Sequence, residues 1–271
     1  MSSPGVVYVD ETVDLYRDLR LPKNWSIHYE EEWGSLQASL QWCFRTFPEA
    51  SQYGWLADDT YPRTEGWDKL LEKAAGDWCL SYANDLWFAD GDTTRYELEI
   101  GDNLSSGLCW GGQLVRTVGW WALPGVVQAG IDTAWTSIVG PLGLTRYESD
   151  IIVEHKNYKT GKREQDEVDD WTRNGINYVY NDIQIRNDWA SSTDYVETMA
   201  RVARRANVEL TEPQQVRLRR KLRDQRISQL WNRSMSGARL TKIMELIDAE
   251  PDANYQHPFS ESSDPNMEQA G

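Results

Sequence analysis

The strongest constraint on the fold is an alternation of strand-like and helix-like segments near the N-terminus. Three short runs predict strands: VVYV (6–9), WSIHYEE (25–31) and YGWLA (53–57). The segments between them have the capping residues and apolar spacing of helices: DETVDLYRDL (10–19) and GSLQASLQWCFRTFPEA (34–50). Strand, helix, strand, helix, strand is typical of a parallel α/β sheet.

The α/β pattern continues along the chain. TEGWDKLLEKAAG (64–76) predicts a helix, and DWCLSYAND (77–85) predicts a strand with a polar exit. Residues 108–120 predict a strand and a turn that begin a second half. Residues 124–143 predict one helix broken by glycines, and ESDIIVEH (148–155) predicts a further strand.

Three parts follow from this pattern. Residues 1–175 are expected to form the α/β domain, and residues 176–250 a helical extension, with helices over 176–205 and 213–247. The polar tail, residues 251–271, is expected to be disordered.

Composition narrows the class of protein. Hydrophobic residues make up 40% of the 271, which is enough for a packed core. The 14 tryptophans are open to two interpretations, a Trp-rich core or indole faces that line a site for a sugar or a base. Three widely spaced cysteines without a C-x-x-C pattern argue against a disulfide framework and a zinc site: Cys43, Cys79 and Cys109.

No membrane partner is expected. The N-terminus lacks the basic and apolar regions of a signal peptide. The most apolar segment, residues 119–135, is interrupted by Pro124, Gln128 and Asp132, and is too broken to span a bilayer. We therefore expect a cytoplasmic protein.

The charge distribution is uneven. Residues 196–245 carry twelve Lys or Arg and five acids, a net charge of +7. Since the whole chain has a net charge of −15, the rest of it carries −22. Within this segment PQQVRLRRKLRDQR (213–226) predicts a basic helix, and four of its residues are candidates for binding nucleic-acid phosphates: Arg217, Arg219, Arg220 and Lys221. A solvated helical face and a contact with the acidic body are the alternatives.

Adjacent carboxylates, Asp58 and Asp59, follow the predicted strand 53–57. In open α/β sheets ligands bind outside the carboxyl ends of the strands. Carboxylate oxygens there suit a hard divalent cation such as Mg²⁺ or Mn²⁺. The alternative is an Asp-Asp-Thr-Tyr-Pro turn, in which an Asp side chain caps the backbone.

Two further residues are candidates for chemistry. His155 ends a predicted strand and is either a core imidazole or a ligand that suits Mn²⁺ beside the carboxylates. The Gly-containing loop after it carries Lys156, Lys159, Lys162 and Arg163, which predicts either a phosphate clamp or a solvated loop.

Asp132 lies in the apolar stretch AGIDTAW. A partly desolvated carboxylate can act as a general base. It can equally be a helix N-cap.

The order LADD, GGQLVRT, GIDTAW, IIVEHKNY resembles the glycosyltransferases of the GT-A fold, close to the inverting family-2 type, over about residues 5–175. The resemblance implies a Rossmann-like, mixed and mostly parallel sheet flanked by helices. It also implies Mn²⁺ or Mg²⁺ and a nucleotide-sugar donor, for which a UDP-sugar is expected.

The same resemblance implies roles for single residues. Asp58 and Asp59 match the metal and nucleotide element, with Asp59 expected to touch the cation, and His155 matches the late metal ligand. Asp132 matches the base that deprotonates the acceptor hydroxyl. Trp110, Gly111 and Gly112 match the acceptor and sugar pocket. Trp135 and Lys159 are further candidates for substrate binding.

The acceptor is open at this point. Compact enzymes of this kind resemble phage glycosyltransferases that modify hydroxylated bases in DNA, which places the chain in the host cytoplasm if it is phage-encoded. A protein or glycan acceptor is an alternative. A non-catalytic carbohydrate- or nucleotide-binding module and a metal-dependent nucleotidyl- or phosphotransferase are the competing classes.

Overall fold

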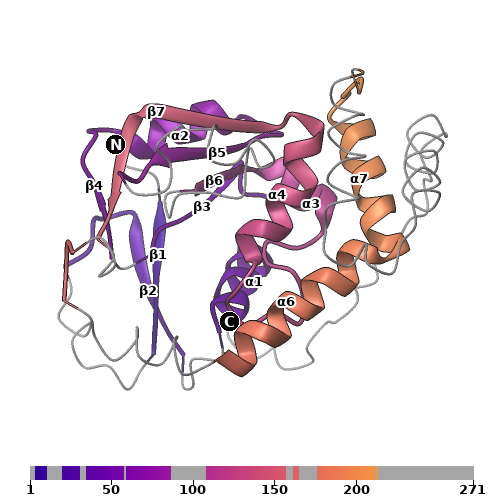
Figure 1. Ribbon diagram of the computed structural model, residues 1–271. Coiled ribbons are helices and arrows are strands. Elements are labelled where there is room, and N and C mark those ends of the chain that lie inside the picture. Colours follow the sequence, from indigo (N-terminus) through magenta and orange to yellow (C-terminus); the bar gives the residue numbers. More distant parts are fainter. Residues whose placement is uncertain are drawn as a thin grey trace.

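A computed structural model describes most of the first 212 residues: 4–10, 20–30, 35–57, 59–86, 108–156, 161–164, 176–210 and 212. The chain is an α/β protein with a mixed sheet flanked by helices (Figure 1). The elements expected over 10–19, 213–247 and 251–271 lie outside the described residues.

The main sheet has five strands. In spatial order they are β3 (Gln52–Trp55), β6 (Leu108–Gly111), β5 (Leu80–Asn84), β7 (Thr145–His155) and β4 (Thr60–Pro62). Only β5 and β7 pair in parallel, and the other three pairings are antiparallel. A second, two-stranded parallel sheet joins β1 (Gly5–Asp10) to β2 (Trp25–Glu30).

The expectation of one mostly parallel sheet is therefore wrong, although the expected strands are present. A parallel neighbour requires a crossover connection, usually a helix. Only four residues, 56–59, separate β3 from β4 in the sequence, which is too few for a crossover. These two strands nevertheless form opposite edges of the sheet. A connection of this length spans roughly 17 Å, whereas four strand spacings of about 4.8 Å amount to about 19 Å in a flat sheet, so the sheet curls.

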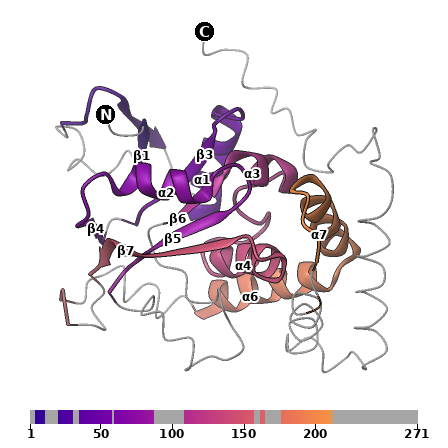
Figure 2. The same ribbon diagram turned by 90° about the horizontal axis from the view of Figure 1, so that it is seen from above.

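Helices cover both faces of this sheet. Figure 2 shows α2 (Trp67–Ala75) on one side of β5 and β7, and α4 (Ile131–Leu142) on the other. The remaining helices are α1 (Leu36–Thr46), α3 (Gly112–Val118), α6 (Ile176–Ser191) and α7 (Thr193–Arg205). The helix expected over 34–50 is confirmed, and its N-cap is Ser35, whose Oγ accepts a hydrogen bond from the Ala38 N–H at 3.0 Å.

Two local expectations are wrong. Residues 112–118 form a helix where a turn was expected, because β6 passes directly into α3 at Gly111. The helix that was expected to be broken is continuous through Gly140 and Pro141. Proline cannot donate to the carbonyl four residues earlier, and in this helix the Tyr195 hydroxyl donates to that carbonyl, of Ser137, at 3.0 Å.

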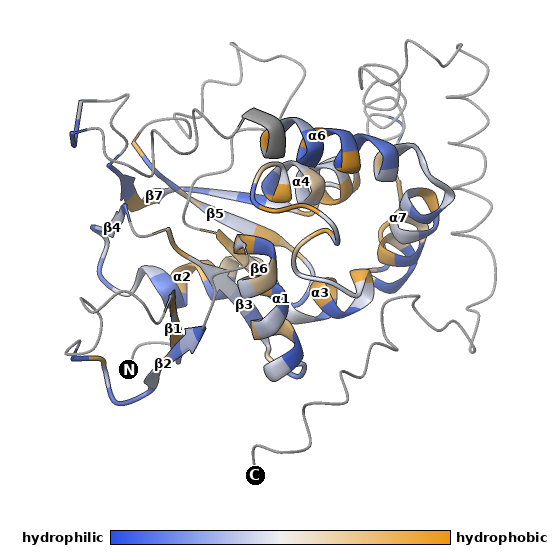
Figure 3. Ribbon diagram, turned by 90° about the horizontal axis from the view of Figure 1, so that it is seen from below, coloured by the Kyte–Doolittle hydropathy of each residue, from blue (hydrophilic) through white to orange (hydrophobic). Residues whose placement is uncertain are grey.

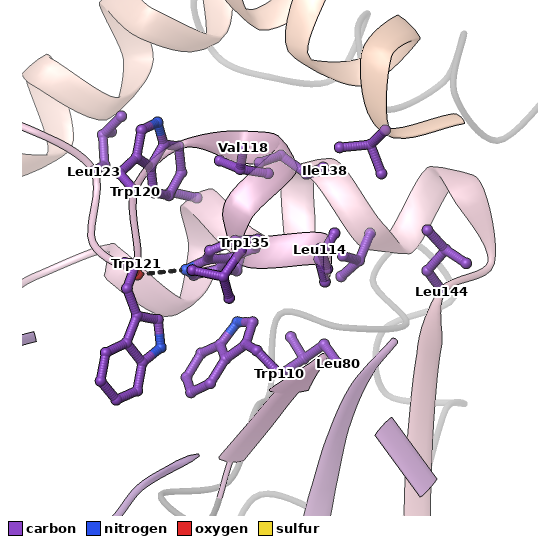
Figure 4. Close-up of a cluster of buried hydrophobic side chains, with 14 of the residues drawn as sticks. Leu80, Trp110, Leu114, Val118, Trp120, Trp121, Leu123, Trp135, Ile138 and Leu144 are labelled. Carbon is purple, nitrogen blue, oxygen red and sulfur yellow. Dashed lines mark hydrogen bonds between the residues drawn. The ribbon is translucent and has the colours of Figure 1, made fainter. Parts of the chain in front are cut away.

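Tryptophans dominate the core. Trp110, Trp120 and Trp135 are almost completely buried, and the Trp135 Nε1–H donates to the Trp121 carbonyl at 2.7 Å (Figure 4). The amphipathic α7, with its mixed hydrophobic and hydrophilic colouring in Figure 3, adds residues to the same core: Tyr195, Val196, Met199, Val202 and Ala203. The described helices after residue 175 thus share one core with the sheet.

Among the described residues, no helix combines the length and the apolar character needed to cross a membrane. Cys43, Cys79 and Cys109 are free thiols.

Candidate functional site

The ends of two strands bring Asp59 and His155 together. Asp59 directly precedes β4, and His155 is the last residue of β7, where it pairs with Thr60. The Lys156 N–H donates to the Asp59 carbonyl at 2.8 Å, and the His155 N–H donates to the Asp85 carbonyl at 3.0 Å. The site therefore lies where the parallel strands β5 and β7 reach their carboxyl ends.

The two side chains are in direct contact. His155 Nε2 lies 2.9 Å from Asp59 Oδ2, and the side chains are 14% and 19% exposed. Two neighbouring ligands of an octahedral ion, each about 2.1 Å from it, lie about 3 Å apart. The contact itself is a hydrogen bond between the imidazole and the carboxylate, and its length is about equal to the separation of two adjacent ligands of an octahedral cation.

Cationic side chains surround the pair. Arg163 Nη2 lies 3.9 Å from Asp59 Oδ2. Lys162 Nζ lies 3.3 Å from Glu154 Oε1 and donates to the Leu86 carbonyl at 3.3 Å. This arrangement suits an anionic group such as a phosphate beside the pair.

The edge of the site is also charged. The Lys156 ammonium lies 4.1 Å from the centre of the Tyr61 ring, a cation–π contact. Arg63 Nη2 lies 2.6 Å from Glu154 Oε2, and this hydrogen bond and ion pair lower the pKa of the Glu154 carboxyl. Glu154 therefore stays ionised and holds Arg63 and Lys162 on either side.

Asp59 and His155 are the two described side chains that could ligate a metal at this site. No group of three or more His, Cys, Asp or Glu side chains gathers for a metal within the described part of the chain. Asp58, the other predicted metal and nucleotide residue, lies outside the described residues, as do Lys159 and the predicted nucleic-acid residues Arg217, Arg219, Arg220 and Lys221.

Asp132 is carried by a third element. It lies in the first turn of α4, and its Oδ1 accepts hydrogen bonds from the Thr133 N–H at 2.7 Å and from the Thr133 hydroxyl at 3.3 Å. The residue at the N-cap position is Gly130, with φ +80°, and not Asp132. The carboxylate lies in the first turn of the helix, at the end where the helix dipole attracts negative charge.

The four predicted pocket residues with described positions lie in the core. Trp110 and Trp135 are 0% exposed. A Cβ on Gly111 would lie 2.2 Å from the Asp77 carbonyl carbon, and one on Gly112 would lie 2.2 Å from the Ala50 oxygen. In the structure these two glycines therefore have a packing role at the β6–α3 junction.

Two buried acids were not identified from the sequence. Asp85 directly follows β5, accepts a hydrogen bond from the His155 N–H through its backbone carbonyl and is 0% exposed; the polar exit of the segment 77–85 was its only sequence signal. Asp182 in α6 is also 0% exposed, and no motif marks it.

In comparisons with known proteins, no protein-family model and no curated protein matches the chain.

Proposed function

We propose that the chain is a metal-dependent glycosyltransferase of the GT-A type that moves a sugar from a nucleoside-diphosphate sugar to an acceptor hydroxyl with inversion. The observation that supports the proposal is the hydrogen bond between Asp59 and His155, two side chains of types that can ligate a metal and that lie 96 residues apart in the sequence. Their order with Asp132 is the order of the glycosyltransferase motifs, and the cations beside them match a diphosphate donor.

Asp59 and His155 would hold Mn²⁺ or Mg²⁺, with Asp58 as a further ligand or a ribose contact. A bound divalent cation neutralises the charge that develops on a departing diphosphate. Arg163 and Lys162 would hold the phosphate oxygens through charge-assisted hydrogen bonds.

Asp132 would remove the proton from the acceptor hydroxyl as its oxygen attacks the anomeric carbon. The new bond joins this oxygen to the anomeric carbon, and the bond from that carbon to the diphosphate breaks. The nucleoside diphosphate leaves with the electron pair, and the proton stays on Asp132. Attack from the face opposite the leaving group inverts the anomeric configuration.

The test is release of a nucleoside diphosphate from nucleotide-sugars, UDP-sugars first, in the presence of Mn²⁺. We expect Asp59→Asn to lower the rate by at least about 100-fold, since metal stabilisation of the leaving group is worth several kcal/mol. The matched control is Asp150→Asn, an exposed carboxylate within β7.

The products separate the competing classes. Pyrophosphate or phosphate release would indicate a nucleotidyl- or phosphotransferase instead. Binding of a nucleotide-sugar without turnover, measured as a raised melting temperature, would indicate a binding module.

For the acceptor we propose a hydroxylated base in DNA, bound through the basic segment and flipped or otherwise accessible. The support is the net charge of +7 on residues 196–245 against −22 elsewhere. Charge reversal of Arg217, Arg219 and Arg220 should abolish a gel shift with duplex DNA. No shift at all, or an unchanged shift, would contradict a DNA acceptor and favour a protein or glycan.

The reaction is proposed for the cytoplasm, the host cytoplasm if the chain is phage-encoded. The three free thiols suit that reducing compartment.

A further inference from the structure

Asp182, in the middle of α6, is a fully buried carboxylate that binds three consecutive backbone amides. Its Oδ1 accepts from the Val127 N–H at 2.8 Å, and its Oδ2 accepts from Gln128 at 2.8 Å and from Ala129 at 2.7 Å. An ionised group buried without such bonds is strongly destabilised. Charge-assisted hydrogen bonds of this length are about twice as strong as neutral ones, so the carboxylate fixes the segment 127–129.

The same segment is also bound from α1. The Gln37 N–H, in the first turn of that helix, donates to the Val127 carbonyl at 3.2 Å. The segment is thus held between α1 and α6.

The next residue starts α4. Gly130 has φ +80°, a conformation that favours glycine, and a Cβ on it would lie 3.5 Å from Arg186 Cδ. Arg186 follows Asp182 by one turn of α6. One face of α6 therefore packs against the segment that leads into α4.

We infer that Asp182 is the positioning residue for the general base Asp132; the inference rests on the proposed function. Only Gly130 and Ile131 separate the clamped segment from Asp132, so a shift of the segment moves the carboxylate with it. A displacement of about 1 Å in a catalytic group can cost about 100-fold in rate. Asp59 directly precedes β4 and His155 ends β7, so neither lies on the helices or the segment that this clamp joins.

The decisive variant is Asp182→Asn, which keeps the shape of the side chain. It replaces one of the two acceptor oxygens by an N–H₂ group, which cannot accept a hydrogen bond from the backbone N–H groups that face it. We expect the amides of Val127, Gln128 and Ala129 to exchange hydrogen at least about 10-fold faster than in the wild type. The amides of Thr133 and Ala134, in the first turn of α4, should follow. If this variant does not fold, Asp182→Ser replaces it, because a hydroxyl still accepts from one amide.

The kinetic measurement separates positioning from general stability. Asp182→Asn should lower kcat by about 10- to 100-fold while the affinities for Mn²⁺ and for the nucleotide-sugar stay unchanged. The double variant Asp132→Asn, Asp182→Asn should be no slower than Asp132→Asn alone, because a misplaced base and an absent base are equivalent. Asp188→Asn, a carboxylate that is bonded to Gln184 on the exposed part of the same helix, is the matched control and should match the wild type in every assay.

The outcomes also separate this inference from the proposed function. Unchanged exchange at residues 127–134, or a rate loss that multiplies with that of Asp132→Asn, overturns the positioning role even if the enzyme is active. A wild type without transfer activity overturns the proposed function and, with it, the base that Asp182 would position.

Discussion

His155 Nε2 and Asp59 Oδ2 lie 2.9 Å apart at the junction of β7 and β4, where 96 residues of sequence separate them. Backbone pairing on both sides fixes this contact: Thr60 pairs with His155, and the Lys156 N–H binds the Asp59 carbonyl. Backbone pairing thus holds the two side chains beside each other.

The first prediction concerns Mn²⁺ affinity. If Asp59 and His155 hold the cation as proposed, replacing His155 by Ala should weaken Mn²⁺ binding by at least about 10-fold, because it removes one of the two proposed ligands; a loss of that size is common even for residues that only support a ligand. Isothermal titration calorimetry or the free-Mn²⁺ electron paramagnetic resonance signal measures it. His28→Ala is the control, since His28 stacks on Trp42 away from this strand junction. Equal Mn²⁺ binding by both variants would contradict the metal centre.

The second prediction concerns Arg163, which lies 3.9 Å from the same Asp59 oxygen. A cation and a guanidinium at one carboxylate repel each other, and a partly exposed ion pair is worth about 0.2–1 kcal/mol. Arg163→Gln should therefore strengthen Mn²⁺ binding by up to about 5-fold and weaken nucleoside-diphosphate binding. Arg146→Gln, near the opposite end of β7, should change neither. Weaker Mn²⁺ binding in Arg163→Gln would refute this competition.

The sequence predicted local structure well and long-range pairing poorly. Apolar runs and helical spacing identified the segments that became β5, β7, α1 and α2, because these signals are local. Pairing between strands distant in sequence has no such signal, and so the antiparallel neighbours of β6 were not anticipated.

The candidate site shows the same division. Asp59 and His155 were identified because they follow or end predicted strands, and Asp132 because it interrupts an apolar stretch. Asp182 lies in the middle of a helix, where nothing in the sequence distinguishes it from an acid on the helix surface. Its role depends on backbone amides that are more than fifty residues away in the sequence. Only the folded chain reveals that contact.

The third prediction concerns the glycines of the β6–α3 junction. Gly112→Ala would place a Cβ 2.2 Å from the Ala50 backbone oxygen, and backbone cannot rotate away as a side chain can. We expect a loss of about 3 kcal/mol in the free energy of unfolding, measured by urea denaturation. Gly54→Ala, whose Cβ would lie 3.5 Å from the Leu108 oxygen, should change stability by less than about 0.5 kcal/mol. Similar stability of the two variants would show that the junction is looser than its contacts imply.

The fourth prediction tests whether Trp135 serves as a core residue or as part of the substrate pocket. Trp135→Phe removes the 2.7 Å hydrogen bond to the Trp121 carbonyl and part of a fully buried ring. It should cost about 2–3 kcal/mol of stability and leave nucleotide-sugar affinity unchanged. Tyr180→Ala, at 67% exposure, is the control and should cost little. A lower affinity with unchanged stability would instead place Trp135 in the substrate pocket.

The fifth prediction concerns acid stability and the pair formed by Tyr8 and Glu30 on β1 and β2. The hydrogen bond from the Tyr8 hydroxyl lowers the pKa of the Glu30 carboxyl below its usual 4.5; burial opposes this shift, and the hydrogen bond from His28 adds to it. A carboxyl whose pKa is lower in the folded state stabilises the fold above pH 4.5, and this stability is lost as the pH falls through the folded pKa.

Tyr8→Phe should therefore lower the free energy of unfolding by about 1 kcal/mol at pH 7, and the difference from the wild type should shrink as the pH falls below 4.5. Thermal unfolding at a series of pH values between 7 and about 3 measures both effects. The matched control is Tyr61→Phe on β4, which removes the hydroxyl from an exposed ring. This change should leave the pH dependence of the unfolding free energy unaltered. A constant difference between Tyr8→Phe and the wild type across this range would show that Glu30 does not carry the acid dependence.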